Sequence, residues 1–280
     1  MKNLVKDLIK RLISSFFLIG IAALLLIFAY TPYFFIAVIG TIALFSTVAT
    51  YELSNICKFK STSANLLLLV FSPLLVVSFF LTTVDPVFLK LPVIIVFLFI
   101  ILTFIKHFSD VKNAIVDTSI ALFSLIYVSV PLGMLVYILY SINGYSLVDG
   151  RMWIFIILLL SKISDIFGYF IGKSFGKNKM IENVSPNKTW EGSIAGIIAT
   201  LGIALLVQYF LPNTFNSYLK AIVIGGITVI LSQIGDLSES LLKRDANIKD
   251  SSKIPGIGGV LDSLDSLLFT IPFYYIWLGY

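Results

Sequence analysis

The chain has 280 residues, of which 58% are hydrophobic and only 12% are charged, and its formal net charge at pH 7 is +5. Soluble domains carry about 25% charged residues, so this composition excludes an ordinary water-soluble fold and indicates a membrane protein. The positive charge does not indicate a nucleic-acid partner, because no basic patch interleaved with aromatic residues occurs outside the apolar runs. Cys57 is the single cysteine and His107 the single histidine, which excludes an intrachain disulfide and a Cys/His zinc site.

The apolar runs predict an all-α, polytopic integral membrane protein. A helix needs roughly 20 mostly apolar residues to cross about 30 Å of hydrocarbon, and such runs recur along the chain. Breaks rich in Pro, Asn, Lys or Gly separate them, and we read the first run as an uncleaved span. The predicted transmembrane helices number about nine, at residues 12–30, 33–50, 66–84, 91–105, 119–141, 152–171, 192–211, 220–235 and 266–280.

Basic residues predict the orientation of these helices, because Lys and Arg accumulate in the cytoplasmic segments of membrane proteins. With the N-terminus inside the cell, the nine spans place 16 of the 20 Lys and Arg residues in cytoplasmic segments. Only Lys90, Arg151 and Lys220 fall outside, and Lys162 falls within a span. We therefore expect the N-terminus and the polar loops to be cytoplasmic.

Polar residues divide the chain unevenly. Residues 1–150 form an N-terminal region of about five spans that are almost purely apolar. Residues 151–280 form a C-terminal transmembrane region with two cytoplasmic loops, at 172–191 and 236–265, and we expect the chemistry in this region.

Lys162 and Asp165 lie three residues apart in an otherwise apolar run, so they share one helical face and can pair. A charge at mid-membrane costs about 2.5–3.5 kcal/mol on insertion scales, so such residues usually face a cavity or a partner and carry function. The pair also fits a purely structural role in packing. Gly168 and Gly172, one turn apart on the same helix, would permit close approach of another helix.

The segment from Ser185 to Gly192 gathers hydroxyls, an amide, a cation and a carboxylate just before an apolar run. Lys188, Thr189 and the backbone N–H groups of a following helix can form an anion site, because the helix dipole favours phosphate there. The same residues suit an ordinary capped helix start. The residues alone leave both interpretations open.

The last loop begins with a charged helical face. Asp236, Glu239 and Lys243 follow the spacing i, i+3, i+7, which places two carboxylates and a cation on one side of a helix. Such a run of charges also suits a solvated linker with surface ion pairs. A linker, however, has no need of carboxylates that abut the membrane.

The same loop continues into a glycine-rich turn at 255–259, where backbone N–H groups can approach an anion closely. Asp262 and Asp265 follow, three residues apart, at the start of the last span. Carboxylate clusters of this kind suit Mg²⁺, which commonly binds through one or two carboxylates and substrate phosphates.

Together, these motifs resemble the signature of the bacterial phosphatidate cytidylyltransferases, the CDP-diacylglycerol synthases. The resemblance extends over about residues 160–266, and the combination is more specific than any single part. The matching positions are Ser164, Asp165, Gly168, Gly176, Lys177, the run from Ser185 to Gly192, the run from Gly235 to Arg244, Lys249, Asp250, Pro255, Gly256, Gly258, Gly259, Asp262, Asp265 and Ser266.

The resemblance implies an enzyme of phospholipid biosynthesis in the bacterial plasma (inner) membrane, with its active site on the cytoplasmic side. Its substrates would be CTP and phosphatidate, and its products CDP-diacylglycerol and diphosphate. The implied cofactor is Mg²⁺, with room for a second metal ion, and the implied partners are the lipid bilayer and a second copy in a homodimer. The implied residues are, for catalysis, Asp236, Lys243, Arg244, Lys249 and Asp250; for substrate binding, Ser185, Lys188, Thr189, Gly256, Gly258 and Gly259; and for the metal, Asp236, Asp262 and Asp265.

Two positions depart from the family pattern, which usually has His where Ile257 stands and Arg where Ser263 stands. Any role of an imidazole or a guanidinium at these points is therefore absent or moved. Two other functions fit parts of the sequence. A CTP-dependent lipid-alcohol kinase would transfer the γ-phosphate instead, and a secondary transporter would also place charges and glycines in its helices. The transporter is disfavoured because the N-terminal region does not repeat the polar pattern.

Overall fold

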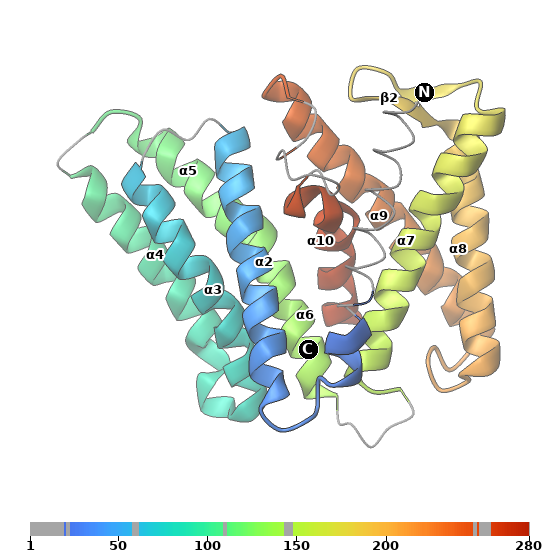
Figure 1. Cartoon of the computed structure of the whole chain (residues 1–280), viewed down its shortest axis with the longest axis horizontal. Coiled ribbons are helices and arrows are strands. Elements are labelled where there is room, and N and C mark those ends of the chain that lie inside the picture. The colour runs from blue at the N-terminus through green and yellow to red at the C-terminus, as the bar shows by residue number, and fades with distance from the viewer. Residues whose placement is uncertain are drawn as a thin grey trace. The chain divides into compact units, whose positions relative to one another are not determined.

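The computed structural model describes residues 20, 23–57, 62–108, 111–142, 148–248, 251 and 259–279, and helices dominate these ranges (Figure 1). The helices long and apolar enough to cross a membrane are Phe34–Ile56, Asn65–Val84, Pro86–His107, Ala114–Ser141, Gly150–Phe175, Trp190–Phe210 and Tyr218–Asp245. These seven confirm an all-α integral membrane protein, interrupted only by one short hairpin in the described ranges. The first predicted span lies mostly outside the described residues, and the ninth corresponds to a helix at Val260–Trp277.

Contacts divide the chain into two compact units. Unit 1 consists of Met1–Ser141 with Ile248–Ser263, and unit 2 consists of Ile142–Asn247 with Leu264–Tyr280. The last helix therefore begins in unit 1 and continues in unit 2.

Unit 1 is a helical bundle with an aliphatic and aromatic core. Its elements are α2 (Phe34–Ile56), α3 (Thr62–Val84), the 3₁₀-helix η1 (Pro86–Lys90), α4 (Leu91–His107), α5 (Ala114–Ser124), the π-helix η2 (Leu125–Ser129) and α6 (Val130–Ser141). The buried core combines Leu68, Phe71, Leu75, Phe79, Phe99, Ala121 and Leu125. The rings of Phe71 and Phe99 lie 5.4 Å apart, which joins α3 to α4.

Three buried hydroxyls form a closed ring of hydrogen bonds inside this bundle. Ser46 Oγ on α2 lies 2.7 Å from Ser72 Oγ on α3 and 2.9 Å from Ser129 Oγ in η2. Ser129 Oγ lies 2.9 Å from Ser72 Oγ, which completes the ring. The described part of the bundle is thus joined by polar contacts as well as by apolar packing.

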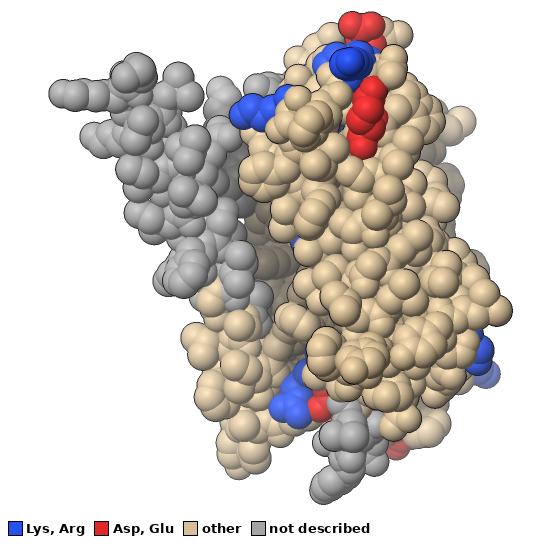
Figure 2. All heavy atoms as spheres, turned by 90° about the vertical axis from the view of Figure 1, so that its right-hand side faces the viewer, with Lys and Arg blue, Asp and Glu red and all other residues tan. Residues whose placement is uncertain are grey.

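Unit 2 contains α7 (Gly150–Phe175), the antiparallel strands β1 (Lys179–Ile181) and β2 (Ser185–Thr189), α8 (Trp190–Phe210), α9 (Tyr218–Asp245) and α10 (Val260–Trp277) from Leu264 onward. The side chains of Asp149, Thr189 and Ser217 cap the N-termini of α7, α8 and α9. Figure 2 looks onto the side that carries α8. Charged side chains gather at the two ends of this face, and a broad band between them is nearly free of charge, as expected of a surface that faces lipid.

Glycines bring α7 and α8 into close contact. A Cβ added at Gly192 would lie 2.5 Å from the carbonyl oxygen of Gly168 and 3.1 Å from Cα of Gly172. A side chain at Gly192 would therefore force the helices apart. The predicted role of Gly168 and Gly172 in close helix approach is confirmed.

The helices are longer than the apolar runs that predict them. α7 continues to Phe175 and α9 continues to Asp245, so both extend past the predicted span ends at 171 and 235 into sequence that contains charged residues. Much of the segment predicted as a loop at 172–191 forms the hairpin, and α10 takes up the end of the segment predicted at 236–265. A span predicted from hydropathy ends where the apolar residues end, whereas a helix can continue into the headgroup region and beyond.

Candidate functional site

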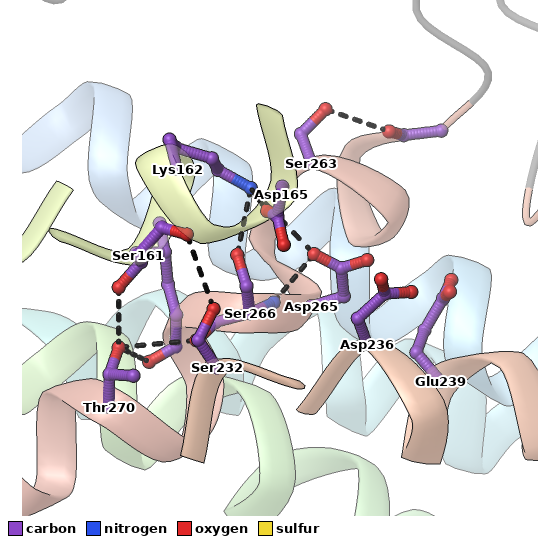
Figure 3. Close-up of polar contacts among 12 residues, drawn as sticks. Ser161, Lys162, Asp165, Ser232, Asp236, Glu239, Ser263, Asp265, Ser266 and Thr270 are labelled. Atoms are coloured by element: carbon purple, nitrogen blue, oxygen red, sulfur yellow. Dashed lines mark hydrogen bonds and ion pairs between the residues drawn. The ribbon is translucent and has the colours of Figure 1, made fainter. Parts of the chain in front are cut away.

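Lys162 joins α7 to α10 in unit 2 (Figure 3). Its Nζ lies 3.5 Å from Oδ2 of Asp165, which confirms the predicted pair, and 3.8 Å from Oδ1 of Asp265 on α10. It also donates a hydrogen bond to Oγ of Ser266 at 2.8 Å. Two carboxylates and a hydroxyl therefore offset the cost of placing an ammonium group in a membrane helix, which is about 2.5–3.5 kcal/mol on insertion scales.

Asp236 on α9 lies next to this cluster because α9 and α10 approach closely at Gly235. A Cβ at Gly235 would collide with the carbonyl oxygen of Asp265, so only glycine allows this contact. In Figure 3 the side chains of Asp265 and Asp236 lie next to each other, and the two carboxylates interact electrostatically. Ser266 N donates to Oδ1 of Asp265 at 2.5 Å, which helps to fix that carboxylate.

Lys188 on β2 balances the charge of Asp236. Its Nζ lies 2.6 Å from Oδ2 of Asp236, and both side chains are 27% exposed, so the pair is partly accessible to a ligand. The next residue, Thr189, is buried and its Oγ1 accepts a hydrogen bond from Gly192 N at 3.2 Å. The capped helix start that the sequence allows is therefore present, and binding of an anion by Lys188 and Thr189 stays a prediction.

A pocket opens beside this ion pair, between α7, α8, α9 and the hairpin. Its lining includes Asp165, Asn187, Lys188 and Asp236, together with two glycines of the α7–α8 contact, Gly168 and Gly192. Gln233 also lines the pocket. Its Oε1 accepts a hydrogen bond from Ser193 Oγ at 2.6 Å, and its Nε2 donates one to Ser164 Oγ at 3.3 Å. The sequence reasoning did not single out Gln233, and an amide one turn before Asp236 in an apolar span is the signal that could have found it.

Two predicted cations lie on the last turns of α9. Lys243 Nζ forms an ion pair with Glu239, whose side chain is fully buried, as the predicted helical face allows. Arg244 Nε donates to the carbonyl oxygen of Val184 at 3.1 Å and so ties α9 to the hairpin. Ser185 begins β2 immediately after this contact. The catalytic and substrate-binding roles of Lys243, Arg244 and Ser185 stay predictions.

In unit 1, the start of α10 is held by a residue that the sequence reasoning missed. Glu52 on α2 accepts hydrogen bonds from Val260 N at 3.2 Å and from Leu261 N at 2.9 Å. Gly259 lies against Glu52, and Asp262 Oδ2 accepts from Ser251 N at 3.3 Å. The predicted span ends at residue 50, whereas α2 continues to Ile56, so Glu52 belongs to a membrane helix, where a carboxylate usually has a partner or a function.

Several predicted site residues cannot be placed. Lys249, Asp250, Gly256 and Gly258 lie outside the described residues, as does Ile257. Asp236 and Asp265 come together in unit 2, along with Asp165, which the resemblance did not include among the metal ligands.

The donor chemistry of this carboxylate cluster fits the predicted ion, because Mg²⁺ prefers carboxylate oxygens. Within the ranges that the structure describes, no group of three or more His, Cys, Asp or Glu side chains is arranged to hold a metal ion by itself. Each of Asp236 and Asp265 is paired with a lysine instead. Mg²⁺ commonly completes its coordination with water and substrate phosphates, so two carboxylates are a sufficient protein contribution.

The fold and site define an integral membrane protein whose acidic and basic side chains meet beside a pocket between apolar helices. Within that class, the chain belongs to the cytidylyltransferase family, whose model matches residues 9–280. This match confirms the resemblance found in the motifs.

Relatives of this chain carry the name phosphatidate cytidylyltransferase. The protein of Chlamydia pneumoniae is 32% identical over 97% of this chain and 92% of its own length. That of Chlamydia muridarum is 42% identical over 57% of this chain and 54% of its own length, and that of Bacillus subtilis is 40% identical over 46% and 48%. In the last two alignments the chain thus spans about half the length of the relative.

Proposed function

We propose that the chain is a phosphatidate cytidylyltransferase, which converts CTP and phosphatidate to CDP-diacylglycerol and diphosphate. The observation that carries the proposal is the similarity to the Chlamydia pneumoniae protein of that name along nearly the whole of both chains. The site is compatible with it, because lysines and carboxylates meet beside a pocket in a membrane protein. A reaction between a nucleotide and a membrane lipid requires both phosphate-binding groups and contact with the bilayer.

The proposed step joins two anions. An oxygen of the phosphatidate phosphate attacks the α-phosphorus of CTP and forms a new P–O bond. The bond from the α-phosphorus to the oxygen that bridges to the β-phosphorus breaks, and diphosphate leaves with the electron pair. The attacking oxygen is already ionised, so the residues have to position the two phosphates and neutralise charge rather than remove a proton.

We assign this neutralisation to the cations of unit 2. Lys188 is suited to contact a phosphate because it lines the pocket and pairs with a partly exposed carboxylate, that of Asp236. Lys243 and Arg244 would bind further phosphate oxygens. Asp236 and Asp265 would hold Mg²⁺, which when bound supplies positive charge near the α-phosphate. We keep Asp262 as a further ligand and Asp250 as an orienting group or a ligand of a second ion.

The product of the reaction tests the proposal. Purified protein in nanodiscs is incubated with Mg²⁺, phosphatidate and CTP labelled at the α-phosphate, and lipids and nucleotides are then separated. We expect the label in CDP-diacylglycerol, with one diphosphate released for each lipid formed. Label that remains in CDP would indicate a lipid kinase. Absence of any product that depends on phosphatidate would exclude both enzymes.

We infer that the protein lies in the bacterial plasma membrane with Lys60, Lys112, Lys179 and Lys249 on the cytoplasmic side. The distribution of basic residues supports this orientation, and CTP is available only inside the cell. The predicted homodimer is a separate proposal, which light scattering of the detergent-solubilised protein would test.

Cysteine labelling of intact cells tests the orientation. In a Cys57→Ser background, Lys179→Cys should resist an impermeant thiol reagent until the cells are permeabilised. Lys90→Cys is the matched control, because Lys90 is exposed and lies in a segment predicted to face outward. Labelling of position 179 in intact cells would place the hairpin on the wrong side for CTP.

A further inference from the structure

Glu52 is a buried carboxylate in the part of the chain that the sequence assigns to almost purely apolar spans. Its side chain is 5% exposed and lies one turn before the end of α2. Both oxygens accept hydrogen bonds: Oε1 from Val260 N at 3.2 Å, and Oε2 from Leu261 N at 2.9 Å and Ser251 Oγ at 3.1 Å. All of these residues belong to unit 1.

These contacts make Glu52 a cap for α10. The first turn of an α-helix leaves four backbone N–H groups without partners in the helix, and a side chain just before the helix usually satisfies one of them. Here the acceptor comes from a residue 208 positions away in the sequence. Its negative charge also lies at the positive end of the helix dipole, which favours it there.

The backbone around this cap is shaped to fit the carboxylate. A Cβ added at Gly259 would lie 2.8 Å from Oε2 of Glu52 and would overlap Ser251 Oγ, so the contact requires glycine. The same Ser251 donates its N–H to Asp262 on the first turn of α10. Glu52, Ser251, Gly259 and Asp262 thus form one connected group at the start of the helix.

α10 carries two of the aspartates proposed for the reaction. Asp262 lies in its first turn and Asp265 one turn later, where Asp265 meets Lys162. A helix whose first turn frays presents the carboxylate of Asp262 at a different height and angle. Small displacements of this kind are costly in catalysis, and about 1 Å can reduce a rate roughly 100-fold.

We propose that Glu52 is a positioning residue for cytidylyl transfer, which acts by fixing the start of α10 and with it Asp262. The inference rests on the proposed function, since it assigns Asp262 to that reaction. It gives α2 a part in the chemistry in addition to membrane anchoring.

The test combines hydrogen exchange with kinetics on Glu52→Gln in nanodiscs. Glutamine keeps the size of the side chain, but its NH₂ group cannot accept from a backbone N–H. We expect amide exchange over residues 260–264 to become at least roughly tenfold faster, while the rest of unit 1 keeps its protection. We also expect kcat to fall at least roughly tenfold with little change in the KM for CTP, because a positioning defect acts mainly on the transition state. Glu52→Asp, which keeps the charge, should recover part of both losses.

Asp149→Asn is the matched control. It makes the same change at another helix start, where Asp149 Oδ1 accepts from Met152 N at 3.0 Å. Because Asn caps a helix about as well as Asp, exchange over residues 150–153 should change little, exchange over 260–264 should not rise, and kcat should stay within roughly twofold of wild type.

Different results contradict different parts of the argument. Unchanged exchange at 260–264 in Glu52→Gln, or faster exchange across all of α2 to α6, would overturn the role of Glu52 as a specific cap. Faster exchange at 260–264 with normal kcat would overturn its role in positioning. Wild-type protein that makes no labelled lipid would overturn the proposed function, whereas full activity in Glu52→Gln would overturn only the positioning role.

Discussion

Replacing Asp236 with asparagine should reduce CDP-diacylglycerol synthesis by roughly 100- to 1,000-fold, the usual cost of losing one important electrostatic contact in a transition state. Asp236 pairs with Lys188 and interacts with Asp265, so it couples the hairpin to the carboxylates of α9 and α10. Asparagine keeps the shape of the side chain but neither holds the lysine by charge nor contributes a charge to Mg²⁺. The measurement is the initial rate of lipid labelling over a Mg²⁺ titration.

Asp245→Asn is the matched control for this experiment. Asp245 lies on the same helix, is exposed, and ends α9 away from the Lys188 pair. It should retain activity within roughly twofold, as expected of an exposed surface position. Both variants should elute from size-exclusion chromatography as the wild type does. Near-normal activity of Asp236→Asn at all Mg²⁺ concentrations would contradict the proposed roles of Asp236 as metal ligand and lysine partner.

Replacing Gly235 with alanine should reduce activity at least roughly tenfold even though alanine favours helices. The gain in helix propensity is about 1 kcal/mol. Against it, the new Cβ would collide with the carbonyl oxygen of Asp265 and lie 3.3 Å from Cδ2 of Phe269. Overpacking of this kind costs about 1–3 kcal/mol, and a backbone atom cannot rotate away as a side chain can. α9 must therefore move from α10, which separates Asp236 from Asp265.

Gly226→Ala on the same helix shows what the mutation does without the collision. The nearest atom to a Cβ at Gly226 is Cδ2 of Leu201, 4.0 Å away. This variant should be as active as wild type and equally or more resistant to thermal unfolding. Thermal unfolding is measured as the loss of soluble monodisperse protein on heating. Equal activity of Gly235→Ala and Gly226→Ala would show that the close approach of α9 and α10 is dispensable.

The spans and the local pairs could be predicted from the sequence because they depend on residues near one another. Apolar runs are long enough to mark helices, and spacing along one helix predicts the pair of Lys162 with Asp165 and that of Glu239 with Lys243. Likewise, a capped helix start is one of the two interpretations that the residues before Gly192 allow, and Thr189 provides the cap.

Contacts between distant segments could not be predicted in this way. The ion pair of Lys188 with Asp236 depends on a hairpin in a segment predicted as a loop, and strands as short as these leave little periodic signal. The contact of Arg244 with Val184 spans 60 residues and depends on the same hairpin. Glu52 was missed for a different reason: the predicted span ends at residue 50, whereas α2 continues to Ile56 and includes Glu52.

The ring of Ser46, Ser72 and Ser129 has a consequence for how the bundle assembles. In lipid, apolar packing alone does little to fix which face of a helix meets its neighbour, because lipid tails are as apolar as leucine. Hydrogen bonds between helices of this kind contribute only about 0.6 kcal/mol on average, so their effect on total stability is small. They form together, however, only when all three segments have one mutual rotation and height. Ser46 and Glu52 lie six residues apart on α2. Since an α-helix rises about 1.5 Å per residue, the contact that fixes α2 is only about 9 Å along the helix from Glu52. The hydrogen bonds of the three serines therefore help to set the position of the Glu52 carboxylate when the membrane helices assemble.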